Sequence, residues 1–132
     1  MSERNLEIVR RAWDAWADKD MDRLIEDWDP EIEWDLSHFA EAPPDARYRG
    51  VAQVMTLIAN WMAAWETYEA TVEEAAAAGD TVLLIVRRRA RLRETGEQSD
   101  TVAAQVWTLR DERIVSITSY SDLEAGRRAA GV

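Results

Sequence analysis

The chain has no cysteine and only one histidine, His38. Without thiols it can form no disulfide bond, no thiolate metal site and no cysteine nucleophile, and one imidazole is too few for a zinc centre built from histidines. The acidic residues near the start of the chain do not fill this gap, because Asp14, Asp18, Asp20 and Asp22 lack the spacing of a calcium-binding loop. The sequence therefore predicts no metal site and no cofactor.

Basic residues and long apolar runs are also scarce. The chain has 16 Lys and Arg against 26 Asp and Glu, a formal net charge of -10, which would repel nucleic acid and anionic membranes. The opening MSERNLE has no apolar signal core, and the longest strongly apolar run, Val82–Val86, is too short to cross a bilayer. We therefore expect a cytoplasmic protein with neither a nucleic-acid nor a membrane partner. A length of 132 residues suits one domain, residues 1–132, with a core and one modest pocket.

The clearest pattern present is the segment Thr101–Asp122, TVAAQVWTLRDERIVSITSYSD. Two runs that alternate apolar and small polar residues flank Asp111-Glu112-Arg113, which is typical of two antiparallel strands joined by a tight turn. By the period of two, one face of this hairpin is expected to hold Ala103, Gln105, Trp107, Leu109, Val115, Ile117, Ser119 and Ser121. Gln105 and Ser119 interrupt an otherwise mostly apolar face. If the face is buried, these two polar groups need partners or line a cavity that receives a polar group.

Two helices are predicted at the start of the chain. Apolar residues at helical spacing predict the first helix over about residues 4–18: Leu6, Val9, Trp13 and Trp16. Asp20 is a suitable cap for a short second helix that includes Trp28 and is stopped by Pro30. The strand that follows, Glu31–Leu36, alternates acidic and apolar residues, so Asp35 is expected to face water.

A loop, a third helix and further strands follow. Residues 37–49 are predicted to form a long irregular loop, and Gly50 to open a helix with an apolar stripe of Val54, Leu57, Ile58, Trp61 and Trp65. Tyr68–Ala76 is predicted as a strand, although its alanines equally suit a helix. After a turn at Gly79-Asp80, Thr81–Arg93 is expected to form a long strand, and residues 122–130 a short terminal helix.

Helices first and strands after them predict an α+β architecture. The order and spacing of the elements resemble the SnoaL-like branch of the nuclear transport factor two (NTF2-like) superfamily. The stretches that carry the resemblance are IVRRAWDAWADKDMDRLIEDWDPEIEW, YRGVAQV, AGDTVLLIVRRRAR and VWTLRDERIVSITSYSDLEAG. They cover essentially the whole chain. The resemblance implies a cone-shaped α+β barrel, with N-terminal helices packed in the concave face of a curved, mainly antiparallel sheet, whose mouth admits a small hydrophobic ligand.

The resemblance also implies a homodimer. Four apolar residues expected on the outer sheet face would suit such an interface: Leu83, Ile85, Ile114 and Tyr120. Apolar residues on an outer face also occur in monomers, so this pattern supports a dimer without requiring one.

The catalytic groups of the family do not carry over. In SnoaL-type cyclases an aspartate on the last strand acts as acid and base, with a histidine on the preceding strand, and these positions correspond to Ser119 and Gln105. A serine hydroxyl without an activating base and a glutamine amide take up no proton near neutral pH. The aspartate-arginine-aspartate arrangement of limonene epoxide hydrolase is not visible either, since Val86 and Ala90 flank Arg88 on its face.

Two charged or titratable residues remain as catalytic candidates. Arg88 falls among the apolar residues of its strand, where it would hold an anionic oxygen with a forked pair of hydrogen bonds. The alternatives are that it pairs with an internal carboxylate or reaches solvent past a bulge. His38, in the loop near the expected mouth, has a reference pKa of about 6.5 that suits proton transfer, but a single surface histidine commonly has no such role.

The candidate ligand-binding residues are Trp16, Trp34, Tyr48, Trp61, Trp65, Gln105, Trp107 and Ser119. The tryptophans lie on predicted inner faces, where they are either core or cavity lining, and the Tyr48 phenol would donate to a ligand oxygen or tether its loop. The function expected is a pocket protein for a small hydrophobic molecule, with cofactor-independent acid/base catalysis as an isomerase, cyclase or hydrolase as one form of it. The alternative is a non-catalytic binding or homo-oligomeric assembly module of the same fold.

Overall fold

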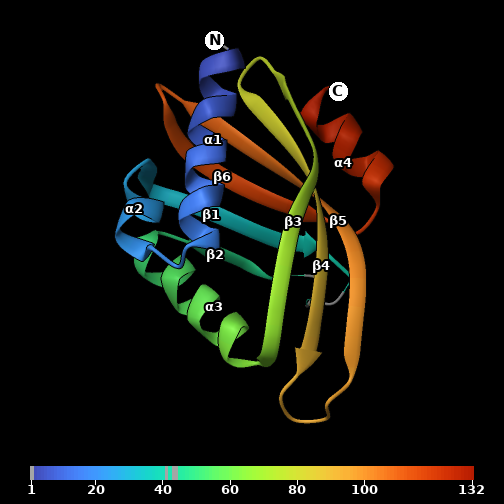
Figure 1. Ribbon diagram of the computed structural model, residues 1–132. Helices are drawn as coiled ribbons and strands as arrows, with labels where there is room; N and C mark the ends of the chain where they lie inside the picture. The colour runs from blue at the N-terminus through green and yellow to red at the C-terminus, as the bar shows by residue number, and fades with distance from the viewer. Residues whose placement is uncertain (1, 41, 43–44) are drawn as a thin grey trace.

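The computed structural model describes residues 2–40, 42 and 45–132. Along the chain the elements are α1 (Ser2–Ala17), α2 (Met21–Ile25), β1 (Trp28–His38), β2 (Arg47–Arg49), α3 (Val51–Ala63), β3 (Trp65–Ala78), β4 (Thr81–Leu92), β5 (Gln98–Arg110), β6 (Arg113–Tyr120) and α4 (Leu123–Ala130). This is the α+β fold predicted from the sequence (Figure 1). No described helix combines the length and apolar character needed to cross a membrane.

The strands form one curved sheet in the order β2-β1-β6-β5-β4-β3. All neighbouring pairs are antiparallel except β1 and β6, which run parallel. In the predicted final hairpin, Arg110 pairs with Arg113, and the two residues between them, Asp111 and Glu112, have φ values of 52° and 62°. Positive φ at both central positions is typical of the two-residue turn whose twist matches that of antiparallel strands. This turn explains how the hairpin closes so tightly.

A bulge in β6 changes which residues face inward. Thr108 pairs with Ser116 and the next residue, Leu109, pairs with Ile114, so Val115 is an extra residue in β6. The extra residue turns Ile114 into the main core, where it is fully buried. The prediction that Ile114 lies on the outer face was therefore wrong, because strict alternation does not allow for a bulge.

Helices α1, α2 and α3 cover the concave side of the sheet, as Figure 1 shows, and the main core lies between the two layers. Its fully buried side chains include Ile8, Val9, Ile32, Val54 and Val82, contributed by helices and strands alike. The apolar stripes of the helices and the alternating apolar residues of the strands therefore pack against each other in the main core, as their periodicity requires.

Helix α4 packs on the opposite, convex side of the sheet (Figure 1). A second, smaller cluster there contains Leu83, Ile85, Ala104, Val106 and Ala130. Leu83 and Ile85 do lie on the outer face, but their exposed fractions are 0% and 5% because the chain's own terminal helix covers them. These two residues therefore lend no support to a homodimer, and the homodimer stays a prediction.

Three boundaries differ from those predicted. Trp28 begins β1, where it pairs with Ile114, and does not end α2; Pro30 is accommodated at the irregular start of that strand. Trp65 begins β3 instead of ending α3. Within the predicted loop 37–49, residues 47–49 pair with β1 as the short strand β2.

Candidate functional site

A partly open cavity of about 100 Å³ lies between the helices and the concave face of the sheet. Six of the seven tryptophans line it: Trp13, Trp16, Trp28, Trp34, Trp61 and Trp107. Phe39 and Tyr68 add two further aromatic rings, and aliphatic side chains fill most of the remaining wall. Aromatic residues are therefore the most numerous group in the cavity lining.

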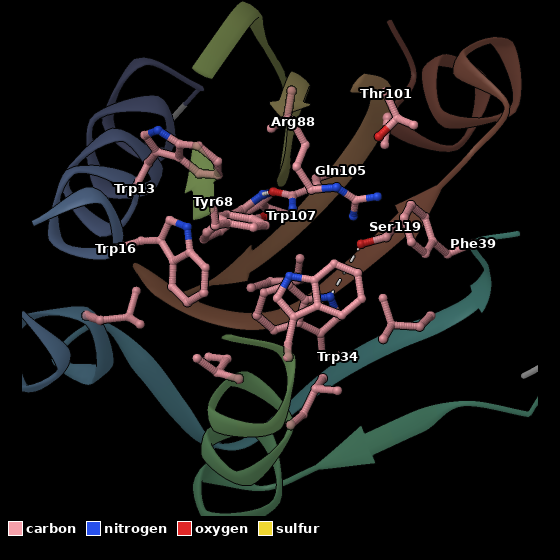
Figure 2. Close-up of a pocket in the computed structure, with 18 of the residues that line it drawn as sticks. Trp13, Trp16, Trp34, Phe39, Tyr68, Arg88, Thr101, Gln105, Trp107 and Ser119 are labelled. Atoms are coloured by element: carbon pink, nitrogen blue, oxygen red, sulfur yellow. Dashed lines mark hydrogen bonds between the residues drawn. The ribbon is translucent and has the colours of Figure 1, made fainter. Parts of the chain in front are cut away.

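Each wall of the cavity comes from a different element. Trp13 and Trp16, three residues apart on α1, point from one side, and Trp34 of β1 lies below them in the view of Figure 2. Phe39 and Ser119 lie on the side opposite the two α1 tryptophans (Figure 2). Because the walls converge from both layers, the cavity depends on the curvature of the sheet.

Gln105 and Ser119 are directly opposite each other on β5 and β6. Each accepts a hydrogen bond from a tryptophan: the Trp107 Nε1–H donates to Gln105 Oε1 at 3.1 Å, and the Trp34 Nε1–H donates to Ser119 Oγ at 3.4 Å (Figure 2). The two polar residues that interrupt the apolar face therefore lie side by side in the cavity wall. Their oxygen atoms each receive an indole donor, and both side chains retain donors of their own.

Arg88 lies on the inner face of β4 with an exposed fraction of 7%, in the wall of the cavity. Its guanidinium carbon is 5.0 Å from the centre of the Trp61 ring, 5.4 Å from that of Trp65 and 5.6 Å from that of Phe39. Such distances allow cation–π attraction to all three rings. The inward position predicted from its place between Val86 and Ala90 is confirmed, while its role in binding or catalysis stays a prediction.

The structure brings most of the predicted site residues together. The cavity lining includes Trp16, Trp34, Trp61, Arg88, Gln105, Trp107 and Ser119. Trp65 is buried beside the cavity, where its ring contacts the rings of Trp61 and Tyr68 without being part of the lining.

Besides Trp65, two predicted site residues lie outside the cavity lining. Tyr48 of β2 borders a shallow surface groove against α3 and packs partly on the main core. His38 is exposed at the end of β1, and its ring stacks on Tyr120 with the ring centres 4.8 Å apart. The catalytic role suggested for His38 stays a prediction, and it would need the imidazole to leave this stack.

Sequence reasoning missed several lining residues. Trp13 shares the helical stripe of Trp16, and Thr101 shares the face of Gln105 by alternation, so both could have been found from periodicity. Phe39 follows β1 in a segment without a repeating pattern. The hydrogen bond from Ala40 N–H to Ser121 Oγ, at 2.8 Å, anchors the segment next to it to the end of β6, which is a long-range contact that local sequence does not reveal.

The described residues around the cavity carry guanidinium, amide, hydroxyl, phenol and indole groups. None of them is an Asp, Glu, His, Lys or Cys. Among the residues that the structure describes, no three His, Cys, Asp or Glu side chains are grouped to hold a metal ion. The arrangement can therefore enclose an apolar molecule and donate hydrogen bonds to it.

Asp35, next to Trp34 in β1, is not part of this lining. Contrary to expectation it is buried, with an exposed fraction of 9%, and lies 3.5 Å from Arg47. Burial alone would raise its pKa, but hydrogen bonding from Ser37, whose backbone N–H donates to Oδ1 at 2.8 Å, and the charge of Arg47 together hold the pKa below its ordinary value. The carboxylate is thus satisfied within the sheet by its neighbours.

Comparison with known proteins identifies a matching family and several solved structures with a similar fold. The family described as SnoaL-like domain matches residues 9–117. No curated protein matches the chain.

Solved structures share the fold over nearly the whole chain. An NTF2-like protein from Burkholderia xenovorans is 25% identical, with a TM-score of 0.77 and 98% of each chain covered. A hypothetical protein with a ketosteroid isomerase-like fold from Catenulispora acidiphila, in complex with trimethylamine, is 21% identical, with a TM-score of 0.73 and 96% of this chain and 93% of that chain covered. TerC, co-crystallised with polyporic acid, is 17% identical, with a TM-score of 0.77 and coverage of 98% and 99%. These similarities establish the fold predicted from the sequence.

Proposed function

Since this chain belongs to the SnoaL-like domain family, we propose that it binds a small, mainly apolar molecule in the aromatic cavity. The observation that carries the proposal is the cavity itself, which lies between the helices and the sheet and is lined by six tryptophans. A concave, mostly apolar space with a few convergent polar groups is the usual form of a small-molecule site. Tightly packed cores leave few voids of this kind, so this space is costly to keep unless it is used.

The size of the cavity limits the ligand. Its volume of about 100 Å³ is smaller than the roughly 300–1,000 Å³ of typical drug-sized ligand pockets. An engineered apolar cavity of about 150 Å³ in another protein holds benzene. We therefore expect a ligand with about one aromatic ring, unless a lining tryptophan moves to admit a larger one.

The lining favours binding over acid/base catalysis. A general acid or base needs a group that exchanges a proton near the working pH, and the described lining offers a guanidinium, an amide, hydroxyls and a phenol. Two structural neighbours were solved with small molecules, polyporic acid in TerC and trimethylamine in the Catenulispora acidiphila protein, which supports a binding role for this fold. Catalysis as an isomerase, cyclase or hydrolase stays a prediction.

Fluorine NMR with fluorobenzene as the probe tests the proposal, since the protein contributes no background signal. We expect the fluorobenzene resonance to shift or broaden in a saturable manner as protein is added, and toluene to reverse the effect by competition. A resonance that stays unchanged at millimolar probe and near-stoichiometric protein would contradict the proposal.

A further inference from the structure

We propose that the cavity selects ligands that carry a carbonyl oxygen, which the Gln105 amide and the Ser119 hydroxyl recognise as hydrogen-bond donors. This inference rests on the proposed binding function and specifies its ligand class. It is carried by the orientation that two tryptophans impose on these polar groups.

The indole of Trp107 determines which end of the Gln105 amide is available. An indole N–H only donates, so the amide atom 3.1 Å from it must be the oxygen. This contact removes the usual ambiguity between the two ends of a glutamine amide. Gln105 lines the cavity, and with its oxygen held by Trp107 its NH2 group is the part left to bind a ligand.

The Ser119 hydroxyl is likewise left to act as a hydrogen-bond donor. Its Oγ accepts the Trp34 indole N–H at 3.4 Å, which occupies one of the two lone pairs and leaves the hydroxyl hydrogen to donate. Gln105 and Ser119 are paired residues of adjacent strands, and the Cβ atoms of such pairs lie only about 4.5–5.5 Å apart. Their donors can therefore converge on one carbonyl oxygen, which has two lone pairs.

The rest of the wall makes this pair selective. Apart from Thr101, Tyr68, the guanidinium of Arg88 and the indole N–H groups of the tryptophans, the rest of the described lining is apolar, and guanidinium and indole groups also only donate. A ligand without an acceptor would displace water from the Gln105 N–H groups and leave them unpaired, which strongly disfavours an analogue lacking the matching oxygen. The expected ligand is therefore an aromatic ketone, aldehyde or quinone-like compound, in preference to a hydrocarbon of the same shape.

The test compares two probes of nearly identical shape, acetophenone and α-methylstyrene, in which a C=CH2 group replaces the C=O. Isothermal titration calorimetry gives the ratio of their affinities for the wild-type protein and for Gln105→Met, which keeps the chain length but removes the amide. We expect this variant to lower the ketone-to-hydrocarbon ratio about fivefold, the typical effect of one neutral hydrogen bond. The matched control Gln98→Met makes the same change at an exposed position of the same strand and should leave the ratio unchanged.

Ser119→Ala provides a second variant with a smaller structural effect, because it removes the 3.4 Å contact to the partly buried Trp34, whereas Gln105→Met removes the 3.1 Å acceptor of the buried Trp107 indole. We expect it to lower the ratio by a similar factor. A ratio that is the same in the wild-type protein and both folded variants would overturn the inference while leaving the binding function intact. Failure of both probes to bind the wild-type protein would overturn the inference together with the proposed function.

Discussion

The guanidinium carbon of Arg88 lies 5.0 Å from the centre of the Trp61 ring, so a buried cation of the sheet rests against an aromatic ring of α3. Trp65 at the start of β3 and Phe39 after β1 add two more rings at 5.4 and 5.6 Å. Each cation–π contact contributes about 0.5–1 kcal/mol at exposed sites and about 2 kcal/mol when desolvated. Arg88 therefore ties the helical layer to the sheet at one end of the cavity.

Replacing Arg88 by lysine is expected to reduce the free energy of unfolding by about 1–2 kcal/mol. A compact, strongly hydrated ammonium cannot stack its plane on several rings as a guanidinium does, and it loses more hydration when buried. Urea denaturation measures the effect. The control is Arg89→Lys, at the next residue of β4 on the exposed face, which should change the stability by less than about 0.5 kcal/mol. Equal effects of the two substitutions would contradict the role assigned to the aromatic contacts.

Substituting Gly126 by alanine is expected to destabilise the protein, although alanine usually favours a helix by about 1 kcal/mol over glycine. A Cβ atom at this position of α4 would lie 2.5 Å from the Cβ of Ala104, which is far inside normal contact distance. The helix would have to move off the sheet, at a cost of about 1–3 kcal/mol. Thermal unfolding should show a lower midpoint for Gly126→Ala.

The double variant Gly126→Ala, Ala104→Gly separates this clash from other causes. Removing the Ala104 methyl group frees the space that the new Cβ needs, so the double variant should be more stable than the sum of the two single effects predicts. Strictly additive effects on the free energy of unfolding would show that the close approach of α4 to Ala104 does not cause the destabilisation.

Periodicity predicted the part of the site that lies on regular strands. Gln105 and Ser119 were expected on one inner face and are paired in the cavity wall, and Arg88 was expected among the inward residues of its strand. Alternation holds along these stretches because successive side chains of a strand point to opposite faces. The same rule misplaced Ile114, because the extra residue Val115 shifts the alternation and local sequence gives no sign of it.

The rest of the site depends on contacts between distant segments. Phe39 approaches Arg88 from a segment without periodic pattern, and Trp28 reaches the cavity because β1 begins earlier than its apolar alternation suggested. His38 and Tyr48 were chosen for their chemistry and for their place near the expected mouth. Their side chains instead pack on Tyr120 and against α3, and neither outcome can be derived from residue type.

The stability of the protein is expected to depend on the ionisation of Asp35. Its pKa is lowered in the folded state, so the carboxylate contributes stability in full above the ordinary aspartate pKa of about 3.9, and this contribution is lost as the pH falls through the folded pKa. Asp35→Asn should therefore be less stable than the wild-type protein by roughly 1 kcal/mol at pH 7, and the difference should shrink below about pH 4.

Urea denaturation at several pH values from about 2.5 to 7, a range that spans the ordinary aspartate pKa, measures the stability difference between Asp35→Asn and the wild-type protein. Asp14→Asn, on the exposed side of α1, serves as the control for removing a carboxylate without removing these contacts. A stability difference for Asp35→Asn that is constant with pH would show that the substitution acts through packing and not through charge.

Filling the cavity is expected to abolish ligand binding without unfolding the protein. Ala103 lines the cavity from β5, next to Gln105 on the same face, and a leucine there would occupy space that an aromatic ring needs. Fluorobenzene affinity should fall at least about tenfold in Ala103→Leu, while the melting temperature stays the same or rises, because filling an existing void commonly stabilises by about 0.5–2 kcal/mol. Val102→Leu adds a methylene on the opposite, exposed side of the same strand and should bind as the wild-type protein does. Because both variants enlarge an apolar side chain on β5, only a loss confined to Ala103→Leu assigns the bound probe to this cavity, and wild-type affinity in a folded Ala103→Leu protein would place the probe elsewhere.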